Sequence, residues 1–561
     1  MTSRVLLALA LACALPAAPA PAAAQHEGHG AAPSRAAADS VPLYDDLGDH
    51  HYAITTRVPL AQRYFDQGLR LYYGFNHAEA VRAFEHAARL DPACAMCHWG
   101  TALALGPNIN APAMDSAATV QAHAAVQRAL RHASGATPRE QALIRALAVR
   151  YAPSPATPRA GLDSAYARAM EAVAREHPDD AEAATLYAES LMDLSPWHYW
   201  TKEGEPRPDT PRILAGLERV IAANPEHPGA CHFFIHAVEE TQPRRAVPCA
   251  ERLAALMPGA GHIVHMPGHI YIRVGRYMDA IRANEHAVHA DETYIRDQRP
   301  GAGIYTLGYY PHNHDFLAFA AMMAGRRDQA LEAAKMVADG IPQEALRAPG
   351  MEFLQHRMTR PLQLLVRFER WDDVLRAPAP PEDLVHARAM WHYARGRALA
   401  ARGRPDDAEA ELARVRAAAA DPALAGVRME FNAPGPILRV AESVLAGHVA
   451  AARGDHAAAA AHLREAARRE DELVYGEPPD WTVPVRQELG EALLAAGRPA
   501  EAERAFREEL EHFPDNGWSL RGLARSLRAQ GREAEAAEAE ARFRTAWKDA
   551  DAGLRGTAAG R

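Results

Sequence analysis

A sequence period of about 34 residues near the C-terminus constrains this chain more than any other feature. The segments that begin at Arg486 and Leu520 match each other after that shift. The recurring pairs are Leu489 and Leu523, Leu493 and Leu527, Gly497 and Gly531, Arg498 and Arg532, and Ala502 and Ala536. Each period holds two stretches with apolar residues at helical spacing and a glycine between them, which predicts a repeated pair of helices.

The same frame fits the segment from Ala61 to Pro92. With Ala61 as position 1, the consensus positions of the tetratricopeptide repeat carry the consensus residue types: Gly68 at 8, Leu71 at 11, Ala80 at 20, Phe84 at 24, Ala87 at 27 and Pro92 at 32. The chain therefore resembles tetratricopeptide-repeat proteins, most clearly over 61–94, 261–294 and 483–550. Together with phrases such as "HPGACHFFIHAVEE" and "GHIVHMPGHIY", it is similar to a group of exported bacterial members of that family.

The resemblance implies an all-α fold, an α-solenoid of helix-turn-helix repeats. Within it we expect the following divisions of the chain: N-terminal repeats over 43–180, central repeats with a histidine-rich concave groove over 181–345, irregular helical repeats over 346–480, a C-terminal repeat pair over 481–551 and a tail over 552–561. A chain of 561 residues exceeds one ordinary globular core, and a solenoid removes that limit.

The composition excludes one class of partner. The formal charge is −9 and no block of lysine or arginine stands out, whereas binding to nucleic acid needs a basic face. We therefore expect no nucleic acid partner, and a protein or peptide as occupant of the groove. No segment after the N-terminus has the length and apolarity of a transmembrane span.

The N-terminus has the pattern of a secretory signal. Arg4 gives a short positive region, Val5 to Leu15 form an apolar stretch, and three alanines at 22–24 fit a cleavage site. Residues 1–24 are thus predicted to be a signal peptide and 25–42, rich in alanine and proline, a flexible leader. The expected location is the periplasm or the cell exterior.

Two histidine pairs occupy equivalent places in adjacent repeats. His232 and His236 stand at positions 5 and 9 of the repeat that starts near Pro228, and His265 and His269 stand at the same positions of the repeat that starts at Gly261. Equivalent positions of neighbouring repeats stack beside each other in a solenoid. The resemblance implies that positions 2, 5, 9, 12 and 13 point into the concave groove.

Other titratable residues fall on the same positions. The candidate metal ligands are His232, His236, His262, His265, His269, His312, Glu189 and Glu240. Imidazole with carboxylate suits zinc, copper or iron, and six histidines are enough for two ions. Two alternatives remain open at this point: a polar groove that binds a peptide or small acid, and histidines that hydrogen-bond between helices without a ligand.

"CAMCH" at 94–98 has the pattern of c-type haem attachment, with Cys94 and Cys97 as thioether sites and His98 as axial ligand. It also fits a Cys94–Cys97 disulfide at a repeat junction. Cys231 is either a further metal ligand or the partner of Cys249.

No motif names a reaction. The chain has no nucleophile elbow, no phosphate-binding loop and no dinucleotide fingerprint. The leading hypothesis is an exported scaffold with a histidine and carboxylate metal site in its groove. The alternatives are a protein-interaction scaffold without metal and a haem protein.

Overall fold

The computed structural model describes residues 41–555, so the predicted signal peptide and all but the last two residues of the leader lie outside it. Within that range every regular element is a helix, and the only strand-like contacts are two isolated bridges, Asn108 with Ala111 and Trp200 with Pro206. The prediction of an all-α solenoid of helix-turn-helix repeats is confirmed. None of the helices in this range combines the length and the apolarity needed to cross a membrane.

The helices follow one another in antiparallel hairpins. The first part holds α1 Pro59–Tyr73, α2 His77–Leu90, α3 Ala95–Ala104, α4 Ser116–His132, α5 Pro138–Ala148 and α6 Arg159–Glu176. The central part holds α7 Ala181–Met192, α8 Thr210–Ala223, α9 Pro228–Val238, α10 Val247–Leu256, α11 Gly261–His265, α12 Pro267–Arg273, α13 Tyr277–Gln298, a π-helical turn Tyr305–Tyr309, α14 Tyr310–Met323 and α15 Arg327–Asp339.

The remaining helices are shorter at first and then regular. They are α16 Leu354–Arg357, α17 Arg360–Arg367, α18 Trp371–Arg376, α19 Val385–Ala401, α20 Pro405–Ala419, α21 Pro434–Ala452, α22 His456–Asp471, α23 Val485–Ala495, α24 Pro499–His512, α25 Gly517–Ala529, α26 Glu533–Ala546 and α27 Ala552–Arg555. α9 and α11 begin at Pro228 and Gly261, where their repeats were predicted to start, and α7 begins at Ala181, the first residue of the expected central repeats.

A phenylalanine between two glycines explains why small residues recur at position 8. A Cβ atom at Gly68 or Gly100 would lie 2.7 or 2.3 Å from the ring of Phe84, so only glycine lets the helices approach so closely. Gly490 and Gly522 enclose Phe506 of the C-terminal pair in the same way. The same contact of a phenylalanine with two glycines is therefore found near both ends of the solenoid.

The repeat of α11 to α13 departs from this rule. Its position 24 is Asn284, and a Cβ atom at Gly268 would lie 2.8 Å from the Asn284 Nδ2 atom. Asn284 is fully buried, so an amide takes the place of an aromatic ring inside the core. A buried amide needs hydrogen-bond partners, which makes this position a marker for a polar interior.

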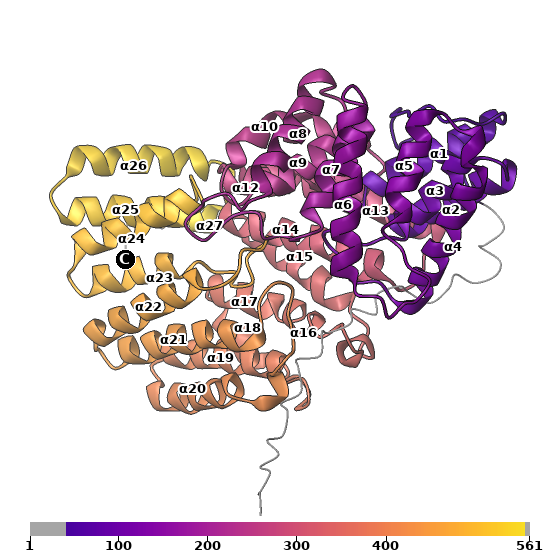
Figure 1. The fold of residues 1–561 in the computed structure, drawn as a ribbon. Coiled ribbons are helices and arrows are strands. Elements are labelled where there is room, and N and C mark those ends of the chain that lie inside the picture. Colours follow the sequence, from indigo (N-terminus) through magenta and orange to yellow (C-terminus); the bar gives the residue numbers. More distant parts are fainter. Residues whose placement is uncertain (1–40, 556–561) are drawn as a thin grey trace, which may run out of the picture.

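Two large hydrophobic cores divide the described chain. One runs from Val41 to Phe368 and also contains Val483 and Phe513, and the other runs from Ala389 to Ala539. In Figure 1 the helices of the first core are coloured from indigo through magenta to pink, and those of the second core are mostly orange and yellow. Phe513, which follows α24, belongs to the first core and packs on Phe319 of α14, with ring centroids 5.4 Å apart. The C-terminal repeats thus return to the central part of the solenoid.

All four cysteines of the described residues are paired. Cys94 bonds to Cys97 at the start of α3, and Cys231 of α9 bonds to Cys249 of α10. Since the Cys231 sulfur is in a disulfide, it is not the thiolate that a metal would need.

Candidate metal centre

Helix α9 carries the first histidine pair. It starts sharply because the His227 side chain caps the Ala230 N–H and Pro228 occupies the first turn. His232 and His236 follow one turn apart, and their Nε2 atoms lie 3.1 Å from each other. His262, at the start of α11, places its Nε2 atom 3.2 Å from that of His232. The three ligand atoms all lie within 4.8 Å of one another.

The second pair, His265 and His269, lies on either side of a break between α11 and α12. Pro267 has no N–H to donate, and α11 ends at His265 before α12 begins. The Nε2 atoms of His265 and His269 are nevertheless 2.9 Å apart. His312 of α14 completes a second group of three ligand atoms within 4.8 Å.

The opposite ring nitrogens are held by hydrogen-bond acceptors. The Nδ1 atom of His232 lies 2.6 Å from the Tyr73 carbonyl oxygen. His265 Nδ1 lies 2.8 Å from Asn284 Oδ1, and the Asn284 amide nitrogen donates to the Ala280 carbonyl, which fixes its orientation. Both Nδ1 atoms therefore carry the proton, and in the neutral rings both Nε2 atoms are left with a lone pair.

Two buried glutamates stand behind the remaining pair of imidazoles. The Glu239 Oε2 atom lies 2.9 Å from His269 Nδ1 and 3.5 Å from His236 Nδ1. Glu477, from the loop between α22 and α23, places its Oε2 atom 3.0 Å from the same nitrogen of His269. Carboxylates or carbonyls on the outer nitrogen are the usual second shell of metal-bound histidine.

Lone pairs that face each other at about 3 Å repel unless a proton or a metal ion lies between them. Two nitrogens bound to one tetrahedral ion at roughly 2.0–2.1 Å are about 3.3 Å apart. The observed separations of 2.9, 3.1 and 3.2 Å are close to that value. The separations thus fit a transition metal between the nitrogens, and they also fit a shared proton.

The histidine cluster is buried under aromatic rings rather than spread over an open groove. Five of the six side chains belong to residues no more than 3% exposed, and His312 is half-buried. Phe75 stacks on His262, Phe316 contacts all three rings of the second group, and Trp197 of the loop between α7 and α8 meets His236 edge-on. The expected concave surface is therefore closed at this place.

The protonation of the cluster follows from burial and from the two glutamates. Burial lowers the pKa of five histidines well below 6.5: His232, His236, His262, His265 and His312. Burial opposes the charge of His269 too, but Glu239 and Glu477 outweigh it and raise the pKa of that imidazole. Neutral imidazoles are the form that binds metal, so the other five rings are in that form and His269 has to release a proton when a metal binds.

Two predicted ligands lie elsewhere. Glu189 accepts a hydrogen bond of 2.6 Å from the Tyr72 hydroxyl, and burial with the neighbouring Asp193 raises its pKa to about 8. Glu240 is half-buried, and it is its backbone oxygen that accepts from Arg273. Neither belongs to a group of candidate ligands among the described residues.

The sequence reasoning missed the residues that orient the cluster. Glu239 is at position 12 of the repeat in which Glu240 was the predicted ligand. The signal for Asn284 is an amide at position 24, where other repeats have phenylalanine. Glu477 belongs to a loop several repeats further along the chain, and no sequence signal linked it to the histidines.

The cysteines of the haem-attachment pattern form a disulfide. Cys94 and Cys97 are bonded to each other, so in this state neither sulfur is free for a thioether. His98 Nε2 lies 3.1 Å from the Pro92 carbonyl oxygen, and the ring stacks beside that of His132.

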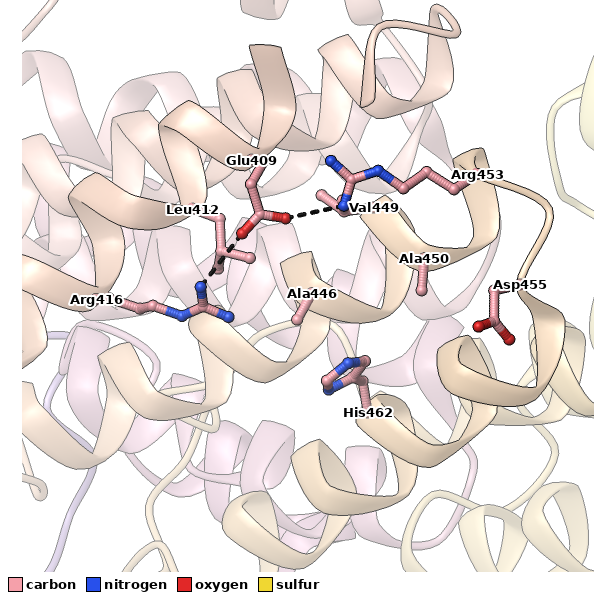
Figure 2. Close-up of a pocket in the computed structure, with 9 residues that line it drawn as sticks. All are labelled: Glu409, Leu412, Arg416, Ala446, Val449, Ala450, Arg453, Asp455 and His462. Carbon is pink, nitrogen blue, oxygen red and sulfur yellow. Dashed lines mark hydrogen bonds and ion pairs between the residues drawn. The ribbon is translucent and has the colours of Figure 1, made fainter. Parts of the chain in front are cut away.

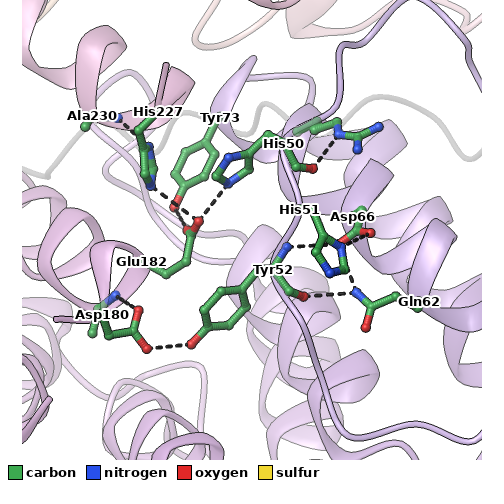
Figure 3. Close-up of polar contacts among 12 residues, drawn as sticks. His50, His51, Tyr52, Gln62, Asp66, Tyr73, Asp180, Glu182, His227 and Ala230 are labelled. Carbon is green, nitrogen blue, oxygen red and sulfur yellow. Dashed lines mark hydrogen bonds and ion pairs between the residues drawn. The ribbon is translucent and has the colours of Figure 1, made fainter. Parts of the chain in front are cut away.

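A second polar cluster surrounds Glu182 and is drawn in Figure 3. Glu182 Oε1 lies 2.7 Å from His50 Nε2 and 3.3 Å from His227 Nε2, and its Oε2 atom accepts from the Tyr73 hydroxyl. His227 Nδ1 accepts the Ala230 N–H, so Nε2 carries the proton and points it at the carboxylate. This group of potential ligands is thus already satisfied by its own protons, and it anchors Tyr73 behind His232.

The structure also contains two surface cavities. One of about 410 Å³ opens beside His50, Glu182 and His227. The other lies between α20, α21 and α22 and is drawn in Figure 2. In it Glu409 pairs with Arg416 and Arg453 at 3.3 and 3.2 Å, so the charges of this cavity neutralise one another.

Comparisons with solved structures give loose matches of whole helical chains. The human IFIT1 dimer with m7Gppp-AAAA is 13% identical, with 88% of this chain and 91% of that chain covered and a TM-score of 0.30. Yeast Tom70 is 11% identical, with 84% and 89% covered and a TM-score of 0.27. These TM-scores are too low to carry an argument about this chain. No curated protein matches the sequence.

One family model does match. Residues 488–551 fit the tetratricopeptide repeat, and they coincide with α23 to α26, where the sequence period is clearest. The C-terminal repeat pair is thereby assigned to the tetratricopeptide repeat family.

Proposed function

We propose that this protein is an exported tetratricopeptide-type scaffold whose buried histidine cluster binds a transition metal such as copper or zinc. The observation that carries the proposal is the orientation of the rings. The Nε2 atoms converge, while Nδ1 of His232, His265 and His269 faces a carbonyl, amide or carboxylate oxygen. His232 and His265 carry the proton on Nδ1, so each directs an Nε2 lone pair at neighbouring imidazole nitrogens, as metal ligands do.

Two further observations support the rest of the proposal. Disulfides persist in oxidising compartments, and both disulfides of the structure agree with the signal pattern at residues 1–24. Repeats of this family present concave surfaces that bind proteins, and the match at 488–551 supports a protein-binding role for the C-terminal pair. The histidines are packed against residues of the first core, whereas most of the buried apolar residues of 488–551 belong to the second.

The test is metal content. The full chain, secreted into a bacterial periplasm, should purify with a stoichiometric transition metal by elemental analysis, and the variant His236→Ala/His269→Ala should lose it. The control is His286→Ala/His289→Ala, which removes two imidazoles from α13 near Asn284 but outside the cluster and should keep the metal. Circular dichroism of all three chains establishes that they are folded. A wild type without metal, or a double variant that retains it, would reject the proposal.

A milder change tests the carboxylate that contacts two of the imidazoles. Glu239→Gln removes the charge behind His236 and His269 but leaves all six imidazoles in place. Loss of such a partner typically costs roughly 10–100-fold in metal affinity, and we expect a decrease of that size in a competition assay with a chromophoric chelator. Glu240→Gln, one residue further along and outside the cluster, is the matched control. Equal affinities of the two variants would show that Glu239 does not orient the ligands.

A further inference from the structure

The six histidines form two sets of three. The first triad is His232, His236 and His262, and the second triad is His265, His269 and His312. Within each triad the three ligand atoms lie within 4.8 Å of one another, but the six atoms do not form one such group. Two ligands of a single ion are at most about 4.2 Å apart, so one ion does not reach all six nitrogens.

Each triad draws on its own elements and has its own anchor. The first combines α9 with the start of α11, and the Tyr73 carbonyl orients it through His232. The second combines the end of α11 with α12 and α14, and Asn284 orients it through His265. Three protein ligands with one position left open are the usual set of a reactive transition-metal site.

The triads are nevertheless neighbours. His236 and His269, one from each, have ring centroids 5.3 Å apart, and His262 and His265 have centroids 5.7 Å apart. Glu239 lies behind both triads, since a single oxygen atom faces His236 and His269. The geometry points to a dinuclear centre, in which each triad binds one copper or zinc ion through three imidazole nitrogens and a small oxygen ligand occupies the open positions between the two ions. This inference rests on the proposed function.

Phe75 stacks on the first triad and Phe316 packs against the second, so aromatic rings cover both triads. The ligand proposed between the two ions is a small oxygen species such as water, hydroxide or dioxygen. Two adjacent ions that share an oxygen ligand are the arrangement that activates such small molecules.

The experiment is a titration of the metal-free full chain with Zn(II), followed by chelator competition. The wild type should bind two equivalents. His232→Ala/His262→Ala removes two ligands of the first triad, and His265→Ala/His312→Ala removes two of the second. Each variant should bind one equivalent, because the other triad is intact. His286→Ala/His289→Ala should bind two.

The outcomes separate the two proposals. A wild type that binds neither Zn(II) nor Cu(II) would overturn both. One equivalent in the wild type would overturn the dinuclear centre alone and leave a metal-binding scaffold. Loading the wild type with Cu(II) gives a measurement that needs no variant. The second equivalent should lower the EPR intensity per copper through coupling, and proportional growth of the signal to two equivalents would contradict a shared ligand.

Discussion

Asp193→Ala should lower the free energy of unfolding by about 3–5 kcal/mol. Arg150 is completely buried, and its guanidinium is held by Asp193 at 2.5 Å and by Asp163 at 3.2 Å. Its plane also lies over the ring of Tyr166, 4.6 Å from the centroid. Removal of Asp193 leaves most of a buried positive charge without compensation, because bulk solvent does not reach the guanidinium to replace the carboxylate.

Urea denaturation followed by circular dichroism measures the effect. Asp209→Ala is the control, because it breaks an exposed pair with Arg212 and should cost no more than about 1 kcal/mol. Metal content should stay the same in both variants, since the Arg150 cluster is separate from the two triads. A loss below about 1 kcal/mol for Asp193→Ala would mean that Arg150 finds another partner.

Removing the disulfide of α9 and α10 is the second large perturbation. Cys231 and Cys249 are 18 residues apart, and a loop of that length restricts the unfolded chain by about 3 kcal/mol. The variant Cys231→Ser/Cys249→Ser should therefore lose about that much stability. Because Cys231 precedes His232 on α9, looser packing of this helix should also weaken metal binding.

The other disulfide provides the comparison. Cys94 and Cys97 are only three residues apart, so Cys94→Ser/Cys97→Ser should cost about 2 kcal/mol and leave metal affinity unchanged. Both variants are measured without reductant by guanidinium denaturation and by chelator competition. If the Cys231 variant were as stable as the wild type, the bond would have no part in holding α9.

The fold was largely predictable because it repeats. Glycine at position 8 and phenylalanine at position 24 are set by one packing contact, seen for Phe84 and again for Phe506, and a contact that recurs leaves a period in the sequence. The helix starts at Pro228 and Gly261 followed from that frame. The same frame placed the pairs His232/His236 and His265/His269 on one surface.

What surrounds the cluster was not predictable in the same way. Glu477 reaches His269 from a loop, where no periodicity constrains the sequence. Trp197, which packs against His236, belongs to the loop between α7 and α8 rather than to a repeat. Glu189 occupied the correct register but faces Tyr72, because a helix position fixes the direction of a side chain and not its partner.

The contact of Glu477 with His269 has a consequence for how this solenoid can change. Repeat arrays usually gain or lose units at their ends, because each unit touches only its neighbours. Here a loop between two helices of the second core supplies a carboxylate to a centre in the first. A chain shortened after α22 would therefore keep all six imidazoles but lose Glu477, one of the two carboxylates that contact His269. The repeats follow one another in the sequence, yet at this point two parts of the chain that are far apart in sequence depend on each other, as they do in a single globular domain.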